Sequence, residues 1–424
     1  MPRRATSLRV ALFHALPPGG ALRALFEIVR RFPADVEVEL FVPTLPAALR
    51  GGQPGATIAA DLAGTVRSIH EYDLALPFRA AAGKGGPYVD WVLGGEAMRF
   101  VQRRMAREVN RSGFDVAFLN ACRYSQTVPI AEWLEVPSVY FAQEIRRASF
   151  EAKPQEIARQ FTAAARRVPL LRRPHEAVCR RRDRRAVAAV DRVLCNSRFA
   201  ADLVATLYGV DPTVCYLGVD PVTFSPDSGR PQPAAARRSE PGGRLFTAIS
   251  VGAMHPVKGH DLALRALASA SRSSNVAARL HVVYEREPRP GFVDVLRGLA
   301  ADSGVELDLH RAITDEELAA LYRQSDVTLC AARLEPFGLT PLESMSCGTP
   351  VVAVAQGGYR ESVRDGVDGY VVERSVDALG ESIARVMRGE LATGPQALST
   401  YARTWGWQEA SDRVLRQLRI AAAS

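Results

Sequence analysis

The sequence predicts an α/β protein of two Rossmann-like domains, each with a parallel β-sheet covered by helices. At 424 residues, of which 47% are hydrophobic, the chain is too long for one typical core. Short apolar runs of strand length alternate with stretches of helical periodicity, and they do so in two separate series. Pro, Gly, Ser and charged residues dominate the segment between the series, so we place a linker at 226–243.

The first series predicts a domain at 1–225. Its first strand is expected at 8–14, followed by a glycine loop and a helix with apolar residues at helical spacing over 24–29. A later helix is expected to begin at Ser197, since serine is a favoured N-cap residue. The further strands are expected at 36–42, 114–119, 138–142 and 193–196.

The second series predicts a domain at 244–404. Thr314 and Glu317 form a capping-box pattern, which predicts the start of a helix that runs through Tyr322. Ligands bind at the carboxyl ends of the strands in such sheets, so the loops after the strands are the candidate site. The strands are expected at 245–251, 281–284, 326–332, 350–354 and 369–372.

The segment from Glu335 to Glu343, which reads E-P-F-G-L-T-P-L-E, carries the strongest functional signal. Pro341 suits the first turn of a helix, where its missing N–H costs nothing. We therefore expect Glu335 at the end of the preceding strand and Glu343 one or two turns inside the helix. A helix start favours anions, and carboxylates accept hydrogen bonds from vicinal hydroxyls. The segment suits a ligand with phosphates and sugar hydroxyls, such as a nucleotide sugar; the alternative is an ordinary turn with two surface glutamates.

The sequence around these glutamates, E-P-F-G-L at 335–339 and M-S-C-G-T-P-V-V-A at 345–353, resembles glycosyltransferase family 4. The resemblance covers most of the chain from Asp191 to Gly369. It implies the GT-B fold, in which two Rossmann-like domains face each other across a cleft, with the acceptor at the first and the donor at the second. It also implies a C-terminal helix at 405–424 that packs back on the first domain.

A second motif, G-A-M-H-P-V-K-G-H-D at 252–261, follows one strand and precedes a helix. We expect Lys258 to place its ammonium on a diphosphate, and Gly259 to let the helix start come close. The alternative is a surface lysine. The family usually carries an arginine where this chain has Ala253, so more of the positive charge falls to Lys258 or to a replacement such as Arg286.

The first domain carries weaker signals. Gly19 and Gly20 resemble the glycine-rich loop of the family, which approaches the sugar phosphate. Family members usually carry a histidine after the strand at 114–119, where this chain has Asn120. His14 lies at a neighbouring strand end; its alternative reading is a structural histidine.

The resemblance implies a role for each candidate. Glu335 would contact the hydroxyls of the donor sugar, Glu343 those of the ribose, and Lys258 with the glycine loop would hold the diphosphate. The candidate catalytic residues are Glu335, Asn120 and His14. The candidate donor-binding residues are Gly19, Gly20, Lys258, Phe337, Gly338, Leu339 and Glu343.

The predicted activity is the transfer of a sugar from a UDP- or GDP-sugar to an acceptor hydroxyl, with retention of configuration. The acceptor is left open between a glycan, a lipid-linked acceptor and a small molecule. No D-x-D motif occurs, so we expect no metal at the donor site and no cofactor. The chain also lacks G-x-G-x-x-G and P-loop motifs, which disfavours NAD oxidoreductases and P-loop nucleotidases. Two alternatives stay open: a catalytically silent nucleotide-sugar-binding or scaffold homologue, and a phosphorylase.

The net charge of +8 is concentrated between Arg159 and Arg185, where arginine pairs and triplets gather. This segment predicts contact with an anionic acceptor or an anionic membrane surface, and its alternative is a solvated helix face. Few aromatic residues interleave with these arginines, so nucleic acid is not expected. Six scattered cysteines without a C-x-x-C pair, no apolar run of membrane-spanning length and no signal peptide predict a cytoplasmic protein, peripheral at most to the inner membrane face.

Overall fold

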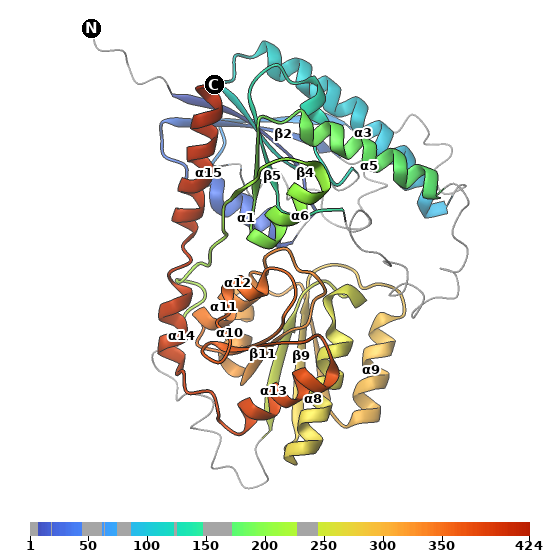
Figure 1. Cartoon of the computed structure of the whole chain (residues 1–424), viewed down its shortest axis with the longest axis vertical. Coiled ribbons are helices and arrows are strands. Elements are labelled where there is room, and N and C mark those ends of the chain that lie inside the picture. Colours follow the sequence, from blue (N-terminus) through green and yellow to red (C-terminus); the bar gives the residue numbers. More distant parts are fainter. Residues whose placement is uncertain are drawn as a thin grey trace. The chain divides into compact units, whose positions relative to one another are not determined.

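The computed structural model describes residues 7–17, 19–44, 62, 64–73, 86–122, 125–146, 172–226 and 245–424. These residues form two compact units (Figure 1). The first contains the described residues up to Tyr216 together with Gln408–Ser424, and the second contains the described part of Leu217–Trp407. Apart from Pro226, the predicted linker lies outside the described residues.

The first unit has a seven-stranded sheet in the order β3-β2-β1-β4-β5-β6-β7, in which every pairing is parallel. The strands are β1 (Leu8–Ala15), β2 (Val36–Thr44), β3 (Ser68–Asp73), β4 (Val116–Cys122), β5 (Ser138–Ala142), β6 (Arg192–Cys195) and β7 (Thr213–Val214). The helical segments are α1 (Gly20–Val29), α3 (Gly86–Arg111), η2 (Pro129–Trp133), α5 (Arg172–Ala188), α6 (Arg198–Tyr208) and α15 (Trp407–Ala422).

The second unit has a six-stranded parallel sheet in the order β10-β9-β8-β11-β12-β13. The strands are β8 (Phe246–Val251), β9 (Ala278–Tyr284), β10 (Glu306–Arg311), β11 (Val327–Cys330), β12 (Val351–Val354) and β13 (Gly369–Val372). The helical segments are η6 (Pro256–Lys258), α8 (His260–Ser274), α9 (Phe292–Ser303), α10 (Asp315–Gln324), α11 (Thr340–Ser346), α12 (Tyr359–Ser362), α13 (Val376–Met387) and α14 (Pro395–Ala402).

The predicted fold class, two parallel α/β sheets, is confirmed, and the predicted strands appear with shifts of a few residues at their ends. The local signals also hold. Ser197 caps α6 by accepting a hydrogen bond from the N–H of Ala200 at 2.9 Å, and Thr314 and Glu317 form both hydrogen bonds of a capping box at the start of α10.

The C-terminal helix α15 packs on the first unit, as predicted. The Ser411 hydroxyl donates a hydrogen bond to the carbonyl of Ile28 at 2.9 Å. Arg192 Nη1 donates to Gln417 Oε1 at 3.3 Å. The last residues of the chain therefore complete the unit that the first residues begin.

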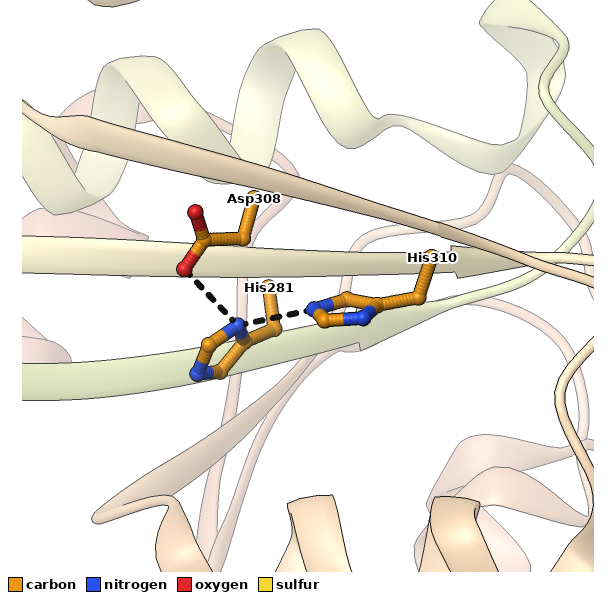
Figure 2. A group of neighbouring side chains, drawn as sticks. All are labelled: His281, Asp308 and His310. Atoms are coloured by element: carbon orange, nitrogen blue, oxygen red, sulfur yellow. Dashed lines mark hydrogen bonds and ion pairs between the residues drawn. The ribbon is translucent and has the colours of Figure 1, made fainter.

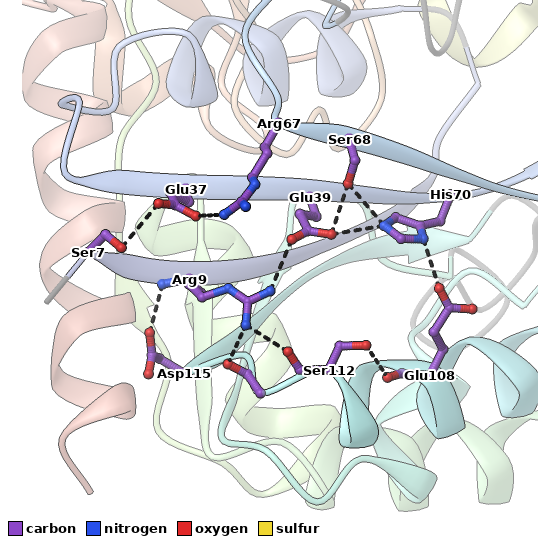
Figure 3. A network of polar contacts seen from close by, with 11 residues as sticks. Ser7, Arg9, Glu37, Glu39, Arg67, Ser68, His70, Glu108, Ser112 and Asp115 are labelled. Carbon is purple, nitrogen blue, oxygen red and sulfur yellow. Dashed lines mark hydrogen bonds and ion pairs between the residues drawn. The ribbon is translucent and has the colours of Figure 1, made fainter.

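The face of β1, β2 and β3 near their starts carries a polar network (Figure 3). Glu39 on β2 lies at its centre and accepts hydrogen bonds from Arg9 at 3.1 Å and from Ser68 at 2.8 Å, with His70 at 2.9 Å. Burial raises the pKa of the Glu39 carboxyl, but these hydrogen bonds outweigh burial and hold it below its ordinary value. Three adjacent strands are thus linked through one carboxylate.

Helix α5 contains the described part of the arginine-rich segment, and 159–171 lie outside the described residues. Its inner face is buried through Cys179, Asp183, Ala186 and Val187. Asp183 pairs with Arg146 at 2.7 Å, with both side chains less than a tenth exposed. Arg180, Arg181, Arg184 and Arg185 lie on the exposed face. The cluster is therefore the outer face of an amphipathic helix.

None of the described helices combines the length and the apolar character that a bilayer-spanning segment requires. All six cysteines are buried, with no disulfide between them.

Candidate donor and acceptor sites

The loop that follows β11 carries Glu335. β11 ends at Cys330, so Glu335 lies five residues beyond the strand and not at its end as predicted. The chain turns within this interval at Leu334, which has a left-handed backbone with φ 48°. Such a conformation is uncommon for a residue with a Cβ, and it persists only where surrounding contacts hold it.

Two glycines hold this loop by close approach. The N–H of Gly358 donates to the carbonyl of Glu335 at 2.8 Å. A Cβ on Gly357, whose φ is 68°, would lie 2.2 Å from the same carbonyl oxygen. A Cβ on Gly338, whose φ is 87°, would lie 2.4 Å from the ring of Tyr359. The positions of Glu335 and Gly338 therefore depend on glycines in both contacting segments.

Lys258 forms an ion pair with Glu335, with Nζ 2.8 Å from Oε2. Both side chains are partly exposed, at 28% and 18%. The next residue, Gly259, has φ 73°, and a Cβ there would lie 2.3 Å from the carbonyl oxygen of Ala331. The predicted close approach at Gly259 is therefore a contact with the chain leaving β11.

His260 fixes the turn that carries Lys258. It is fully buried, its Nε2–H donates to the carbonyl of Gly252 at 3.4 Å, and its Nδ1 accepts from the Ser250 hydroxyl at 2.8 Å. Burial lowers the pKa of His260 to about 4, so the ring is neutral at pH 7. His260 holds the turn without adding charge.

Glu343 is the fourth residue of α11, about one turn from the helix start, which is the shallow end of the predicted depth. Its side chain is 6% exposed and accepts a hydrogen bond from the Tyr322 hydroxyl at 3.1 Å. A buried carboxylate with one oxygen held by a hydroxyl is well placed to accept from a ligand hydroxyl.

The other predicted donor-binding residues of the second unit lie in the short stretch between these glutamates. The Phe337 ring is buried, with its centroid 5.9 Å from that of Trp405. Leu339 is the N-cap of α11, and its carbonyl accepts from the N–H of Glu343 at 3.0 Å. The stretch is thus anchored by a buried ring at one end and a helix start at the other.

Two cations near the Lys258 turn are absent from the sequence prediction. The backbone N–H of Arg289 donates to the carbonyl of Met254 at 3.0 Å, and its Nη1 lies 3.0 Å from His255 Nε2. Arg374 Nε donates to the carbonyl of Ala331 at 3.3 Å. Both follow strands of the sheet, and no local sequence pattern marks them because their partners are far away in the chain.

In the first unit, polar side chains occupy the carboxyl ends of four adjacent strands: β1, β4, β5 and β6. They are His14, Asn120, Gln143 and Asn196, and each is at most 4% exposed. Gln143 Nε2 donates to the carbonyl of Ala21 at 3.0 Å and lies 3.4 Å from Asn120 Oδ1. The row thereby reaches the first turn of α1.

Each member of this row keeps an unsatisfied polar atom: both ring nitrogens of His14, Asn120 Nδ2, Gln143 Oε1 and Asn196 Oδ1. Burial lowers the pKa of His14 to about 3, so its ring is neutral. Unsatisfied buried polar groups cost free energy, and a row of them at strand ends suggests a ligand that completes their hydrogen bonds. Gln143 and Asn196 were not among the predicted residues, although each is a polar residue directly after an apolar strand.

Gly19 and Gly20 begin α1. Gly19 is its N-cap residue with φ 139° and ψ −173°, a backbone conformation suited to glycine, and its carbonyl accepts from the N–H of Arg23 at 3.0 Å. Gly19 thus has a backbone conformation that favours glycine, in the same unit as His14 and Asn120.

Two family models match the chain and together cover most of it. The model described as Glycosyltransferase Family 4 matches residues 18–223, and that of Glycosyl transferases group 1 matches residues 233–405. The two parallel sheets and the returning C-terminal helix are those of the GT-B fold. The chain belongs to the family 4 glycosyltransferases of GT-B fold.

Among curated proteins, D-inositol 3-phosphate glycosyltransferase 1 of Catenulispora acidiphila is 34% identical over 247 residues, which is 55% of this chain and 58% of the relative. The D-inositol 3-phosphate glycosyltransferase of Acidothermus cellulolyticus is 34% identical over 252 residues, 56% of this chain and 55% of the relative. The matched region thus spans little more than half the length of these relatives.

Among solved structures, HepE of Anabaena in complex with UDP has a TM-score of 0.66 at 18% identity and covers 97% of this chain and 99% of its own. Sucrose-phosphate synthase of Thermosynechococcus elongatus has a TM-score of 0.65 at 16% identity, with 98% and 100% covered. At these identities the likeness concerns the fold.

Proposed function

We propose that this protein transfers a sugar from a nucleotide diphosphate sugar to an acceptor hydroxyl, with retention of configuration. The observation that carries the proposal is the ion pair between Lys258 and Glu335 in the second unit. Close contacts with glycines hold the backbone at both residues. The helix that follows Glu335 carries the buried carboxylate of Glu343. A cation for phosphate and two carboxylates for hydroxyls are the groups that such a donor needs. Acceptor binding is assigned to the domain at 1–225 and donor binding to the domain at 244–404.

The donor-side roles follow from the chemistry of each group. Lys258 would hold the diphosphate and stabilise the negative charge that develops on the leaving phosphate. Glu335 would accept from the hydroxyls of the transferred sugar, and Glu343 from the ribose. UDP-sugars are the first donors to test, because HepE is described in complexes with UDP and UDP-glucose, and GDP-sugars are the second.

The acceptor is proposed to be rich in hydroxyls. The row of His14, Asn120, Gln143 and Asn196 offers both donors and acceptors but no fixed charge, which suits a sugar or another polyol. The curated relatives are named for an inositol phosphate, so D-inositol 3-phosphate is the first acceptor to test.

Two measurements test this function. A thermal-shift panel of nucleotides and nucleotide sugars should find a ligand that stabilises the protein by about 2.7 kcal/mol at a hundred times its dissociation constant. Calorimetry should then give the same affinity for that ligand with and without EDTA. If no nucleotide sugar stabilises the protein, the proposal fails; an affinity that collapses in EDTA overturns its metal independence.

A catalytically silent homologue is the second candidate, and Asn120 in place of the usual histidine and Ala253 in place of the usual arginine favour it. Cleavage of the donor separates the two, either as hydrolysis without an acceptor, which releases free sugar, or as transfer to an acceptor, which releases the nucleotide diphosphate. A silent homologue would bind the nucleotide sugar and cleave it in neither case.

We further propose that this protein is cytoplasmic and that the exposed arginines of α5 bind an anionic membrane surface or an anionic acceptor. The buried cysteines without disulfides support the compartment. Flotation with anionic vesicles at low and physiological salt tests the surface, with Arg180, Arg181, Arg184 and Arg185 changed to Gln as the matched variant. Equal flotation of the variant and the wild type would show that these arginines of α5 do not bind the membrane.

A further inference from the structure

A second group of chemically active side chains lies at the edge of the sheet in the second unit. His281 is on β9, and Asp308 and His310 are on β10, the edge strand. The register places Asp308 beside His281, and residues two apart on a strand share a face. Figure 2 shows that the three side chains converge on one point from the two strands. None of them belongs to the proposed donor or acceptor groups.

The distances within this group fit a shared metal ion. His281 Nδ1 lies 3.1 Å from His310 Nε2 and 3.4 Å from Asp308 Oδ2, and the three ligand atoms all lie within 4.8 Å of one another. An ion with bonds of about 2.0–2.2 Å to nitrogen and oxygen holds its ligand atoms roughly 3.0–3.5 Å apart. Two distances already fall in this range, and the 44% exposed Asp308 side chain has freedom to adjust the third.

We propose that His281, Asp308 and His310 bind a late first-row divalent metal ion such as Zn²⁺. Two imidazoles and one carboxylate are ligands that suit this class of ion rather than Mg²⁺ or Ca²⁺. Three protein ligands leave a position for water. Because the ligands come from two strands, the ion clamps the edge strand β10 to β9.

The charges around the site favour a cation. Arg279 on β9 lies with Nε 3.4 Å from Asp308 Oδ2 and also pairs with Glu306. Two carboxylates against one guanidinium leave a net negative charge beside the two imidazoles. Arg279 also competes for Asp308, so its removal should make the carboxylate more available to a metal.

A hydrogen bond between the two imidazoles is the competing explanation, because 3.1 Å also suits N–H···N contact. The two explanations differ in what they require. A hydrogen-bonded pair has no need of Asp308 and binds no ion, whereas a metal site requires all three side chains at once.

Isothermal titration of the full, untagged chain with Zn²⁺, after chelator treatment and dialysis, tests the proposal. The wild type should bind one equivalent at this site. His310→Gln should lose that equivalent, Asp308→Asn should weaken it at least about tenfold, and Arg279→Gln should tighten it. Circular dichroism in chelator should match the wild type for each variant, which shows that the loss is not unfolding. Co²⁺ should give a visible absorption band that His310→Gln lacks.

His70→Gln is the matched control. His70 also lies beside carboxylates, but its Nε2 faces Glu39 at 2.9 Å and its Nδ1 faces Glu108 at 2.8 Å, from opposite sides of the ring (Figure 3). One ion cannot bind both ring nitrogens, so this variant should keep the full equivalent. The proposal is overturned if the wild type gives no heat above the blank, if His310→Gln still binds the equivalent, or if His70→Gln loses it.

Discussion

Lys258 and Glu335 form an ion pair, with Nζ 2.8 Å from Oε2, although 77 residues separate them in the chain. The two groups expected to hold different parts of the donor therefore neutralise each other in the free protein. A diphosphate would compete with Glu335 for the ammonium, and the carboxylate would then be available for sugar hydroxyls. On the proposed roles, donor binding would exchange one charge-assisted hydrogen bond for others.

This exchange gives opposite expectations for the two side chains. Lys258→Ala should weaken the bare nucleotide diphosphate by on the order of 1.5–3 kcal/mol, because it removes a charged hydrogen-bond donor. Glu335→Ala should spare or slightly improve that affinity, because it frees the ammonium, and should mainly lower turnover. Calorimetry with UDP and GDP and a transfer or donor-hydrolysis assay measure both. Weaker nucleotide binding by Glu335→Ala, to the extent seen for Glu343→Ala, would show that the roles are wrongly assigned.

Glu343 is expected to act on the bare nucleotide and the nucleotide sugar alike. Its buried carboxylate would hold the ribose, so Glu343→Ala should weaken both ligands by on the order of 1.5–3 kcal/mol. Tyr322→Phe removes only the hydroxyl that orients Glu343 and should weaken both by less. Calorimetric titrations of Glu343→Ala and Tyr322→Phe with nucleotide and nucleotide sugar check that the first variant loses more affinity than the second. If Glu335→Ala and Glu343→Ala both keep wild-type affinity and rate, the Glu335–Glu343 segment is an ordinary turn.

The glycine contact behind Glu335 yields a prediction with a close control. Gly357→Ala and Gly366→Ala both force a side chain onto a left-handed backbone, with φ 68° and 72°, at a cost of roughly 1–2 kcal/mol in stability. Only the Gly357 methyl would meet the Glu335 carbonyl; the space beside Gly366 is open. Turnover should therefore fall sharply in Gly357→Ala and remain near wild type in Gly366→Ala. Equal turnover in the two variants would mean that the loop position does not matter.

Local sequence signals were sufficient for most of the fold. The strands at the sheet centres are apolar runs, and the caps at Ser197 and Thr314 are short-range patterns, so both could be read directly. β3 and β10 were missed because they read S-I-H-E-Y-D and E-L-D-L-H-R and lie at sheet edges, where half-exposed strands need no apolar run. The proposed metal ligands Asp308 and His310 were missed because the strand that carries them, β10, was missed.

The site was predicted less completely, for a different reason. Glu335, Glu343 and Lys258 lie in recognisable motifs, but their partners come from elsewhere in the chain. The Tyr322 hydroxyl that holds Glu343 and the Gly357 backbone behind Glu335 are set by tertiary packing.

Two buried histidines should make stability depend on pH. Burial lowers the pKa of His14 to about 3 and that of His260 to about 4, whereas an unfolded histidine has a pKa of about 6.5. Below pH 6.5 the unfolded chain therefore binds more protons than the folded one, so the free energy of unfolding falls as the pH falls. At pH 5 each histidine should cost about 2 kcal/mol relative to pH 7.

Urea unfolding at pH 5 and pH 7 measures this loss, and His14→Gln should shrink it by about 2 kcal/mol, because glutamine takes up no proton in this range. The lowered pKa of Glu39 means that its stabilising contribution is lost only at more acidic pH, below about 4.5. Burial raises the pKa of Asp183 and of Asp261, so their burial cost is relieved as the pH falls, in the opposite direction to the histidines. The difference between His14→Gln and the wild type removes this effect, because both proteins carry the two aspartates. The assay should use purified protein without nucleotide sugar, because a bound nucleotide sugar would add its own stabilisation at both pH values. Equal stability of the wild type at pH 5 and pH 7 would mean that His14 and His260 can be protonated in the folded protein. The ring nitrogens of His14 would then already contact solvent and would not need an acceptor substrate to complete their hydrogen bonds.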